Sequence, residues 1–179
     1  NSESLIGKGG LNDVTIGIVD YGIGNQQSLI NALKAQNAEI VLTRDTKKLD
    51  KTDLIALPGV GAFSKGMDQL KKYKLDEYLK YQAANKKSIL GICVGMQMLF
   101  ESSNEFNESY GLGLIKGKVQ KLSEKRKEKF KSILPHMGWN KLRLGSSFKE
   151  MYFKDELYQY FLHSFAVLDL EESKVLYDC

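Results

Sequence analysis

The sequence predicts an α/β fold of three layers, in which a mostly parallel central sheet is covered by helices on both faces and accompanied by a smaller antiparallel strand set. Three observations lead to this fold class. Short apolar runs alternate with segments of helical period through the first two-thirds of the chain. Glycine-rich loops follow the first, third and fourth of these runs. Beyond about Gly111, strand-like segments joined by turns replace the alternation.

The elements of the parallel part can be assigned in order. The expected strands are residues 14–19, 39–43, 54–57 and 88–92. Helices are expected after the first, third and fourth strands. Leu29, Ile30 and Leu33 lie on one face of the first, Phe63, Met67 and Leu70 mark the inner face of the second, and the third begins with Met96, Leu99 and Phe100. Ser28 would cap the first helix, because a serine hydroxyl can accept from backbone N–H groups of the first turn.

The last third of the chain is expected to contribute strands at residues 112–122, 139–144, 151–153 and 160–168, two of which would pair as antiparallel neighbours. No internal repeat or low-complexity block interrupts the pattern. Residues 13–179 are therefore expected to form a single domain. The polar, glycine-containing residues 1–12 are expected to be a flexible tail or an expression remnant.

The composition excludes several classes of protein. Charged residues make up 27% of the chain and hydrophobic residues 42%, as in ordinary globular domains. No apolar run reaches the roughly 18 residues of a membrane span, and residues 1–12 lack the apolar stretch of a secretory signal. The two cysteines, Cys93 and Cys179, show no metal-ligand spacing and make no disulfide framework. We therefore expect a cytoplasmic protein without a metal or an organic cofactor.

The basic residues are unevenly spread. Within a net charge of +4, residues 118–131 hold seven basic residues against Glu124 and Glu128. Such a run can contact nucleic acid, an acidic substrate or an acidic partner, or it can be a solvated loop. We favour the solvated loop and expect no nucleic-acid partner, because no nucleic-acid-binding motif accompanies the run.

The most informative segment places Cys93 directly after an apolar strand, in a Gly-x-Cys-x-Gly pattern that runs into a helix. This is the cysteine form of a nucleophile elbow, a sharp turn that lifts the nucleophile above the sheet. The turn is strained and crowded, which favours glycine at Gly91 and Gly95, and the helix N-terminus favours the thiolate. Backbone N–H groups at the turn can also bind an oxyanion. The alternative is a buried structural cysteine beside a tight turn.

Two further loops follow strands. Residues 58–61, Pro-Gly-Val-Gly, either form a plain turn or direct backbone N–H groups towards an oxyanion above Cys93. Residues 20–25, Asp-Tyr-Gly-Ile-Gly-Asn, resemble a dinucleotide-binding loop only weakly, because Gln27 occupies the position of the third glycine. We therefore exclude nicotinamide binding.

A cysteine nucleophile needs a base, and the chain has two histidines, His136 and His163. Each is a candidate partner of Cys93. The alternative for each is a histidine packed in a turn or a strand, and the sequence does not place either beside the thiol.

Together these segments resemble the class I, or triad, glutamine amidotransferases, and among them the glutaminase subunits of imidazole glycerol phosphate synthases. The resemblance extends from about residue 14 to residue 167. The Gly-x-Cys-x-Gly turn is shared by class I glutaminases, whereas residues 20–25 and 135–140 point to the narrower group. Phe165 departs from the tyrosine more often found at its position.

The resemblance implies that Cys93 attacks the side-chain amide of glutamine and forms a glutamyl thioester, which water hydrolyses to glutamate. It implies oxyanion donors at Gly59, Val60, Gly61 and Val94, contacts with glutamine at Gln97, Ser164 and Phe165, and a partner-facing surface at Asn25, Trp139 and Tyr160. The implied partner is a (β/α)8-barrel synthase subunit that uses the released ammonia in histidine biosynthesis.

In this family the base histidine and its glutamate belong to a His-Pro-Glu motif near the C-terminus, which residues 1–179 do not contain. Neither His136 nor His163 occupies that position. We expect the C-terminal part of the domain to continue beyond Cys179 with this motif; the alternative is a catalytically inactive, partner-binding subunit. Further alternatives are a paralogue that supplies ammonia for bacterial surface-sugar modification, and a cysteine peptidase or chaperone of related fold.

Overall fold

The computed structural model describes residues 13–122, 134–144, 157–168, 170 and 177–178. The expected tail at residues 1–12, the expected strand at residues 151–153, most of the basic run and Cys179 lie outside these ranges.

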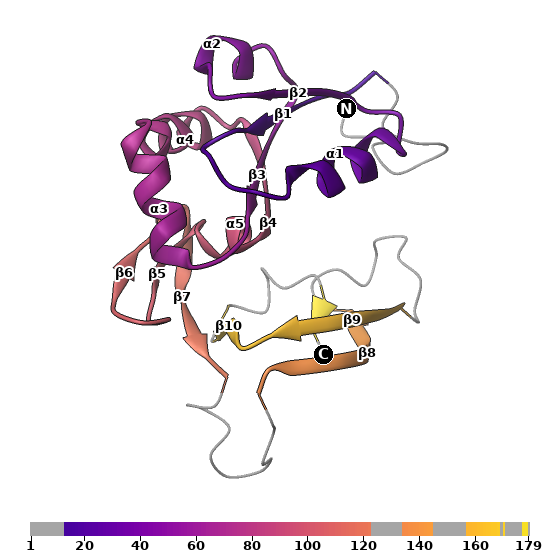
Figure 1. Ribbon diagram of the computed structural model, residues 1–179, viewed down its shortest axis with the longest axis vertical. Coiled ribbons are helices and arrows are strands. Elements are labelled where there is room, and N and C mark those ends of the chain that lie inside the picture. The colour runs from indigo at the N-terminus through magenta and orange to yellow at the C-terminus, as the bar shows by residue number, and fades with distance from the viewer. Residues whose placement is uncertain (1–12, 123–133, 145–156, 169, 171–176, 179) are drawn as a thin grey trace.

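The core of the fold is a four-stranded parallel sheet in the order β2-β1-β3-β4 (Figure 1). Its strands are β1 (Thr15–Val19), β2 (Glu39–Thr43), β3 (Leu54–Gly59) and β4 (Ser88–Cys93), which confirms the expected order of elements. β3 continues through Pro58, beyond the expected end. A proline is tolerated there because the pairing of β3 with β1 ends at Ala56, so no ladder hydrogen bond from residue 58 to β1 is lost.

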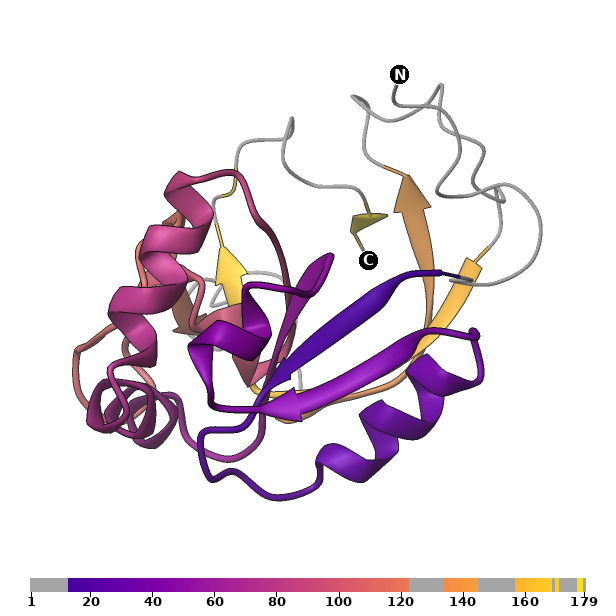
Figure 2. The same ribbon diagram turned by 90° about the horizontal axis from the view of Figure 1, so that it is seen from above.

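Helices cover both faces of this sheet, as predicted (Figures 1 and 2). On one face, α1 (Gln26–Lys34) packs Leu29, Ile30 and Leu33 against Ile16, Ile18 and Ala56. On the other face lie α2 (Thr46–Leu49), α3 (Phe63–Lys72) and α4 (Leu75–Ala84). Their buried side chains, among them Phe63, Met67, Leu70 and Leu79, form one cluster with Ile55 and Leu57 of β3. Alternate side chains of β3 thus point to opposite faces of the sheet and pack into the apolar cluster on each face, as the pleat of a strand requires.

Ser28 is not the cap that the sequence suggested. α1 begins at Gln26, directly after Asn25, whose backbone is left-handed with φ 62°. Ser28 therefore lies inside the first turn, where its hydroxyl donates to Oδ1 of Asn25 at 3.4 Å.

The helix after Cys93 is much shorter than the sequence suggested. α5 (Val94–Gln97) is a single turn, and Phe100 already belongs to strand β5 (Phe100–Ser103). The carbonyl groups of Met98 and Leu99, which would continue the helix, accept hydrogen bonds from the N–H groups of Leu112 and Leu114, each at 2.8 Å. The backbone is therefore satisfied by a distant segment, which helical periodicity does not reveal.

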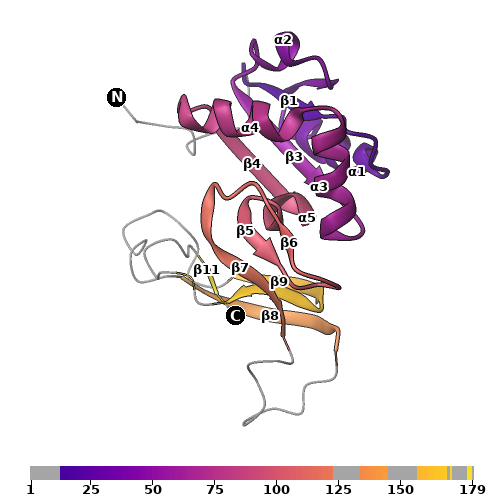
Figure 3. The same ribbon diagram turned by 90° about the vertical axis from the view of Figure 1, so that its left-hand side faces the viewer.

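A second sheet, in the order β10-β7-β5-β6, contains β6 (Ser109–Tyr110), β7 (Ile115–Lys121) and β10 (Phe165–Leu168). A third, in the order β11-β8-β9, contains β8 (His136–Leu144), β9 (Leu157–His163) and β11 (Tyr177–Asp178) (Figure 3). β8 and β9 are the expected antiparallel pair. The single strand expected at residues 160–168 is instead two strands, separated at Ser164, that belong to different sheets.

None of the helices in the described part of the chain has both the length and the apolarity needed to cross a bilayer.

Candidate active site

The glycine-rich loops after β1, β3 and β4 meet at the carboxyl edge of the parallel sheet, because these three strands are neighbours. Gly59, the last residue of β3, stands in register beside Cys93, the last residue of β4. Ligands of parallel α/β sheets bind at this edge. The sheet therefore brings the loop of residues 59–61 directly to the cysteine turn.

Cys93 has the geometry of a nucleophile elbow. Its backbone torsions are φ 56° and ψ −123°, although it is not a glycine, and it joins the end of β4 to the start of α5. Such a conformation costs on the order of 1–3 kcal/mol and persists only where the surrounding structure enforces it. The thiol is free and exposed. A buried structural cysteine is therefore not what the fold contains at this position.

Close backbone packing explains the glycines on both sides of Cys93. A Cβ atom on Gly95 would lie 1.9 Å from the carbonyl oxygen of Leu57, and one on Gly91 would lie 2.5 Å from Cα of Met96. A Cβ on Gly59 would in turn lie 2.3 Å from the backbone nitrogen of Gly95. The turn after β4 is thus pressed against β3, and only glycines permit this contact.

The strain at Cys93 can be measured by comparing two substitutions that both remove the thiol. We expect Cys93→Gly to be more stable than Cys93→Ala by about 1 kcal/mol, because glycine adopts a positive φ without a Cβ clash. Urea unfolding of both variants measures this difference. Equal stabilities, or a more stable alanine variant, would show that residue 93 is not strained.

The structure brings the four expected oxyanion residues together. Gly59 packs on the first turn of α5, where Val94 is buried, and Val60 and Gly61 continue past Gly59 at the exposed edge. Gly61 has φ +82°, and a Cβ there would meet no atom within 4 Å, so the glycine serves the turn rather than packing. Their N–H groups therefore remain candidates for the oxyanion site.

Glu105, which the sequence did not predict as a site residue, supports the loop of residues 59–61. Its Oε2 accepts a hydrogen bond from the backbone N–H of Phe63 at 2.8 Å. Phe63 is the first residue of α3 and is separated from the 59–61 loop by Ala62 alone. A carboxylate at a helix N-terminus satisfies an otherwise unpaired N–H group, and its negative charge interacts favourably with the positive end of the helix dipole. No local pattern signals this contact, because it spans 42 positions of sequence.

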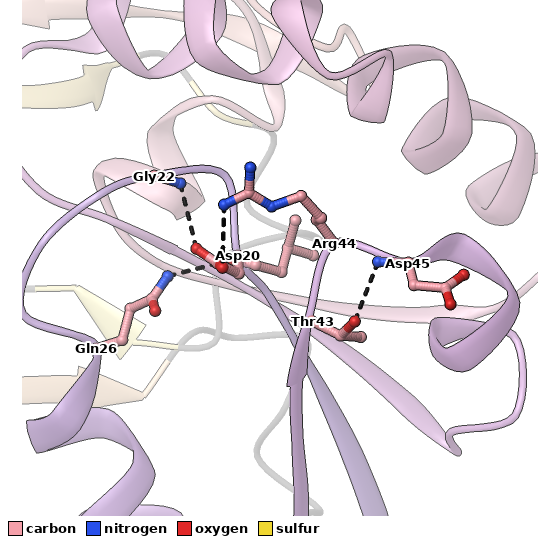
Figure 4. Close-up of polar contacts among 7 residues, drawn as sticks. Asp20, Gly22, Gln26, Thr43, Arg44 and Asp45 are labelled. Carbon is pink, nitrogen blue, oxygen red and sulfur yellow. Dashed lines mark hydrogen bonds and ion pairs between the residues drawn. The ribbon is translucent and has the colours of Figure 1, made fainter.

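The loop of residues 20–25 is held by side chains from other elements (Figure 4). Asp20 accepts from Gly22 N at 3.3 Å and pairs with Arg44 Nη2 at 3.2 Å. The Arg44 guanidinium also lies over the Tyr73 ring, 4.4 Å from its centroid, and the hydrogen bond with Asp20 raises the pKa of Arg44. Asn25 ends this loop with an exposed side chain.

Tyr21 connects the same loop to β3. Its ring is fully buried, and its hydroxyl donates to the carbonyl oxygen of Pro58 at 2.5 Å. Burial raises the pKa of Tyr21, so the phenol remains a hydrogen-bond donor. The loops after β1 and β3 are therefore fastened to each other just before the Gly59–Gly61 segment.

The residues expected to contact glutamine come from two places. Gln97 is half-buried and ends α5, one turn after Cys93. Ser164 and Phe165 lie where the chain passes from β9 to β10, and Leu122 N donates to the Ser164 carbonyl at 3.0 Å. Phe165 packs against the apolar cluster that contains Val94.

The two histidines pair with each other. His136 and His163 face each other across β8 and β9, and Nδ1 of His136 lies 3.0 Å from Nε2 of His163. Within the described residues, no histidine forms a hydrogen bond with the Cys93 thiol. This arrangement agrees with assigning the base to neither of them.

Trp139 and Tyr160 also face each other across the same hairpin, on its other side. Their rings meet edge to face with centroids 5.7 Å apart, and the residues are 71% and 50% exposed. Met137 and Leu162, the next pair on this face, are exposed as well. A contiguous exposed apolar surface of this kind is typical of a protein interaction site.

Comparison with known proteins agrees with this geometry. The family model described as glutamine amidotransferase class-I matches residues 17–178. The chain is 38% identical over 161 residues to imidazole glycerol phosphate synthase subunit HisH of Bacillus velezensis, covering 90% of this chain and 76% of that protein. It is 44% identical over 161 residues to the HisH subunit of Sulfurimonas denitrificans, covering 89% and 77%.

Among solved structures, the fold matches a glutamine amidotransferase with a TM-score of 0.68 at 16% identity, over 92% of this chain and 79% of the other. At this identity the match establishes the shared fold alone. The family model spans nearly the whole chain and includes the strained Cys93 turn, so the chain belongs to the class I glutamine amidotransferases.

Proposed function

We propose that this chain is the glutamine-hydrolysing subunit of an imidazole glycerol phosphate synthase and supplies ammonia to a (β/α)8-barrel synthase subunit in histidine biosynthesis. The observation that carries the proposal is the strained, exposed Cys93 at the end of β4, in register beside Gly59. The similarity to HisH subunits supports the assignment to this synthase.

The proposed chemistry is acyl transfer to a thiolate. The Cys93 sulfur attacks the side-chain amide carbon of glutamine, and the carbonyl oxygen becomes an oxyanion. N–H groups of Gly59, Val60, Gly61 and Val94 are the proposed donors to that oxyanion. The C–N bond then breaks, ammonia leaves with the proton taken from the thiol, and a glutamyl thioester remains. Water attacks the thioester, which releases glutamate and regenerates the thiol.

The proposed glutamine contacts are those that the resemblance to class I glutaminases implies. Gln97 is one helical turn from Cys93 and is proposed to bind the substrate near the reacting amide. Ser164 and Phe165 are proposed to bind the α-amino and α-carboxylate groups at the opposite end of glutamine. Holding both ends of the substrate fixes the amide carbon against the sulfur, which lowers the entropic part of the barrier.

The proposed partner surface includes Trp139 and Tyr160 on the exposed face of the β8–β9 hairpin, and Asn25 at the sheet edge. Large aromatic residues supply much of the binding free energy in protein interfaces. A partner that covers this hairpin face would remove its apolar surface from water.

We expect Trp139→Ala to weaken binding of the synthase subunit by at least about thirtyfold, since truncation of a central aromatic residue costs about 2 kcal/mol or more. The stability of the isolated subunit should change little, because Trp139 is 71% exposed. Titration calorimetry with the barrel subunit measures the loss. The matched control is Tyr81→Ala, which removes a 67% exposed aromatic residue from α4. Equal losses in both variants would contradict the proposed surface.

The function itself is tested by reconstituting the full-length protein with the barrel synthase and supplying glutamine labelled with 15N in the side-chain amide. We expect the label in the imidazole product, one glutamate formed for each product, and little glutamine hydrolysis by the isolated subunit. Glutamate formation without label transfer to this product, as a surface-sugar paralogue would give, would contradict the assignment to this synthase. Absence of glutamate formation would contradict glutaminase activity.

A further inference from the structure

The β8–β9 hairpin carries a chain of side-chain hydrogen bonds that the proposed chemistry does not use. Asn140 Nδ2 lies 2.8 Å from His136 Nε2, and His136 Nδ1 lies 3.0 Å from His163 Nε2. His163 Nδ1 lies 2.9 Å from the carbonyl oxygen of Phe165. The chain thus runs from β8 across β9 to the first residue of β10.

With both imidazole rings neutral, one proton assignment satisfies all three contacts. The Phe165 carbonyl can only accept, so His163 carries its proton on Nδ1 and accepts at Nε2. His136 must then donate from Nδ1, which leaves its Nε2 to accept from the Asn140 amide. In this series of hydrogen bonds, each side chain therefore donates to the next one in the direction of Phe165.

The Phe165 carbonyl depends on this series of side-chain hydrogen bonds, because it accepts no hydrogen bond from the neighbouring strand β7. Leu122 N donates to the Ser164 carbonyl, and Phe165 is in register with Lys121. Bonded and non-bonded pairs alternate in an antiparallel ladder, so the N–H and C=O of Phe165 both point away from β7. His163 satisfies the carbonyl and leaves the N–H of Phe165 on the side where a ligand carboxylate could accept from it.

The imidazole rings of His136 and His163 are packed against neighbouring side chains rather than free in solvent. Phe161 of β9 stacks on His136 with centroids 5.3 Å apart and an interplanar angle of 15°, and its centroid lies 5.7 Å from that of His163. His136, Phe161 and His163 are all half-buried. A packed ring holds its hydrogen bonds in one geometry, which suits a side chain that positions another group.

We propose that His163, supported by His136 and Asn140, is a positioning residue that holds the Phe165 carbonyl and thereby fixes the Ser164–Phe165 segment for binding the α-amino and α-carboxylate groups of glutamine. The inference rests on the proposed glutaminase function and on the placement of glutamine at Ser164 and Phe165. Neither histidine exchanges a proton with the reacting amide. Their effect is confined to the end of the substrate that does not react.

The test compares glutamine with butanamide, which has the same reacting amide but lacks both the α-amino and the α-carboxylate group, using the full-length protein in its synthase complex. We expect His163→Ala to lower kcat/KM for glutamine about a hundredfold, as misplacement of a binding group by about 1 Å can do. The value for butanamide should stay unchanged, so the preference for glutamine falls by the same factor. Equal losses for both substrates, or no loss for either, would overturn the proposal.

Two further variants separate positioning from general damage. His163→Asn keeps an N–H donor close to the Nδ1 position and should restore most of the preference for glutamine. Gln159→Ala changes an exposed side chain on the same face of β9 and should leave that preference unchanged. If His163→Asn is as poor as His163→Ala, the donor to Phe165 is not the cause. A wild-type complex that hydrolyses no glutamine would instead overturn the proposed function, before any variant is compared.

The proton assignment has its own readout, which does not depend on catalysis. In 15N-labelled protein at a pH where both rings are neutral, long-range 1H–15N spectra report which nitrogen carries the proton. We expect the Nδ1–H form for both His136 and His163. The Nε2–H form at His163 would overturn the proposal, because its Nδ1 could not then donate to Phe165.

Discussion

Replacing Cys93 by alanine will abolish glutamine hydrolysis, with a loss in kcat of at least about 10⁴-fold, since removal of a covalent nucleophile leaves only binding and oxyanion stabilisation. The expected loss follows from the exposed thiol and the strained torsions of φ 56° and ψ −123°, which are those of a nucleophile presented at the end of β4. The measurement is glutamate release by the full-length synthase complex, with glutamine in excess.

The matched control for this experiment is Cys179→Ala, because Cys179 is the only other cysteine in the chain. It should retain wild-type turnover. Binding of the barrel subunit should be unchanged in Cys93→Ala, since the proposed surface lies on the β8–β9 hairpin. A Cys93→Ala complex that releases glutamate at the wild-type rate would show that the thioester mechanism is wrong. A loss of partner binding in the same variant would show that the cysteine turn also contributes to the interface.

Gly95→Ala will unfold or severely destabilise the domain, although it adds only one methyl group. The added Cβ would lie 1.9 Å from the Leu57 carbonyl oxygen and 2.8 Å from its carbonyl carbon. These are backbone atoms of a central strand, so they cannot rotate away as a side chain would. We expect the free energy of unfolding to fall by about 3 kcal/mol or more, the upper range for overpacking. Urea unfolding, followed by circular dichroism, measures it.

The control for Gly95→Ala is Gly24→Ala, because a Cβ on Gly24 would meet no atom within 4 Å. Its stability should stay within about 0.5 kcal/mol of the wild type, as for most exposed substitutions. If Gly95→Ala were equally stable, the turn after β4 would have to sit farther from β3 than the structure places it. The close contact between Gly59 and Gly95 would then not be what fixes the proposed oxyanion loop, residues 59–61, beside the cysteine.

The features that the sequence predicted well are those set by local pattern. Apolar runs and glycine spacing located the four parallel strands, and the Gly-x-Cys-x-Gly turn located Cys93 at the end of β4. Both depend on neighbouring residues in the chain, so they can be read directly. The helical faces of α1 and α3 were correct for the same reason.

The features that the sequence did not predict depend on distant partners. α5 stops after one turn because the N–H groups of Leu112 and Leu114 occupy the carbonyls that would extend it. The break at Ser164 arises because β9 pairs with β8 whereas β10 pairs with β7. A continuous apolar run contains no signal for such a change of partner. The sequence also left both histidines as isolated candidates, since only the register of β8 and β9 brings them together.

Side-chain contacts between residues far apart in the sequence were equally hard to predict. Tyr21, Arg44 and Glu105 each support a loop of the candidate site through a contact that spans at least 24 positions of sequence. Arginine and glutamate are common on protein surfaces, so composition does not single out Arg44 or Glu105. Tyr21 lies two residues after the first strand, and its position becomes informative only once its hydroxyl is seen to bind the Pro58 carbonyl.

The two faces of the β8–β9 hairpin depend on the same pairing register of its strands. Alternation along the strands puts Trp139 and Tyr160 on one side and His136 and His163 on the other. A pairing error of one residue would turn the aromatic side chains inward and the imidazoles outward, because side chains change face at every step. Correct pairing is thus a single condition for both surfaces. A subunit that has misfolded in this hairpin would lose the proposed docking surface together with the proposed glutamine contacts, so a defective copy would neither join the complex nor hydrolyse glutamine outside it.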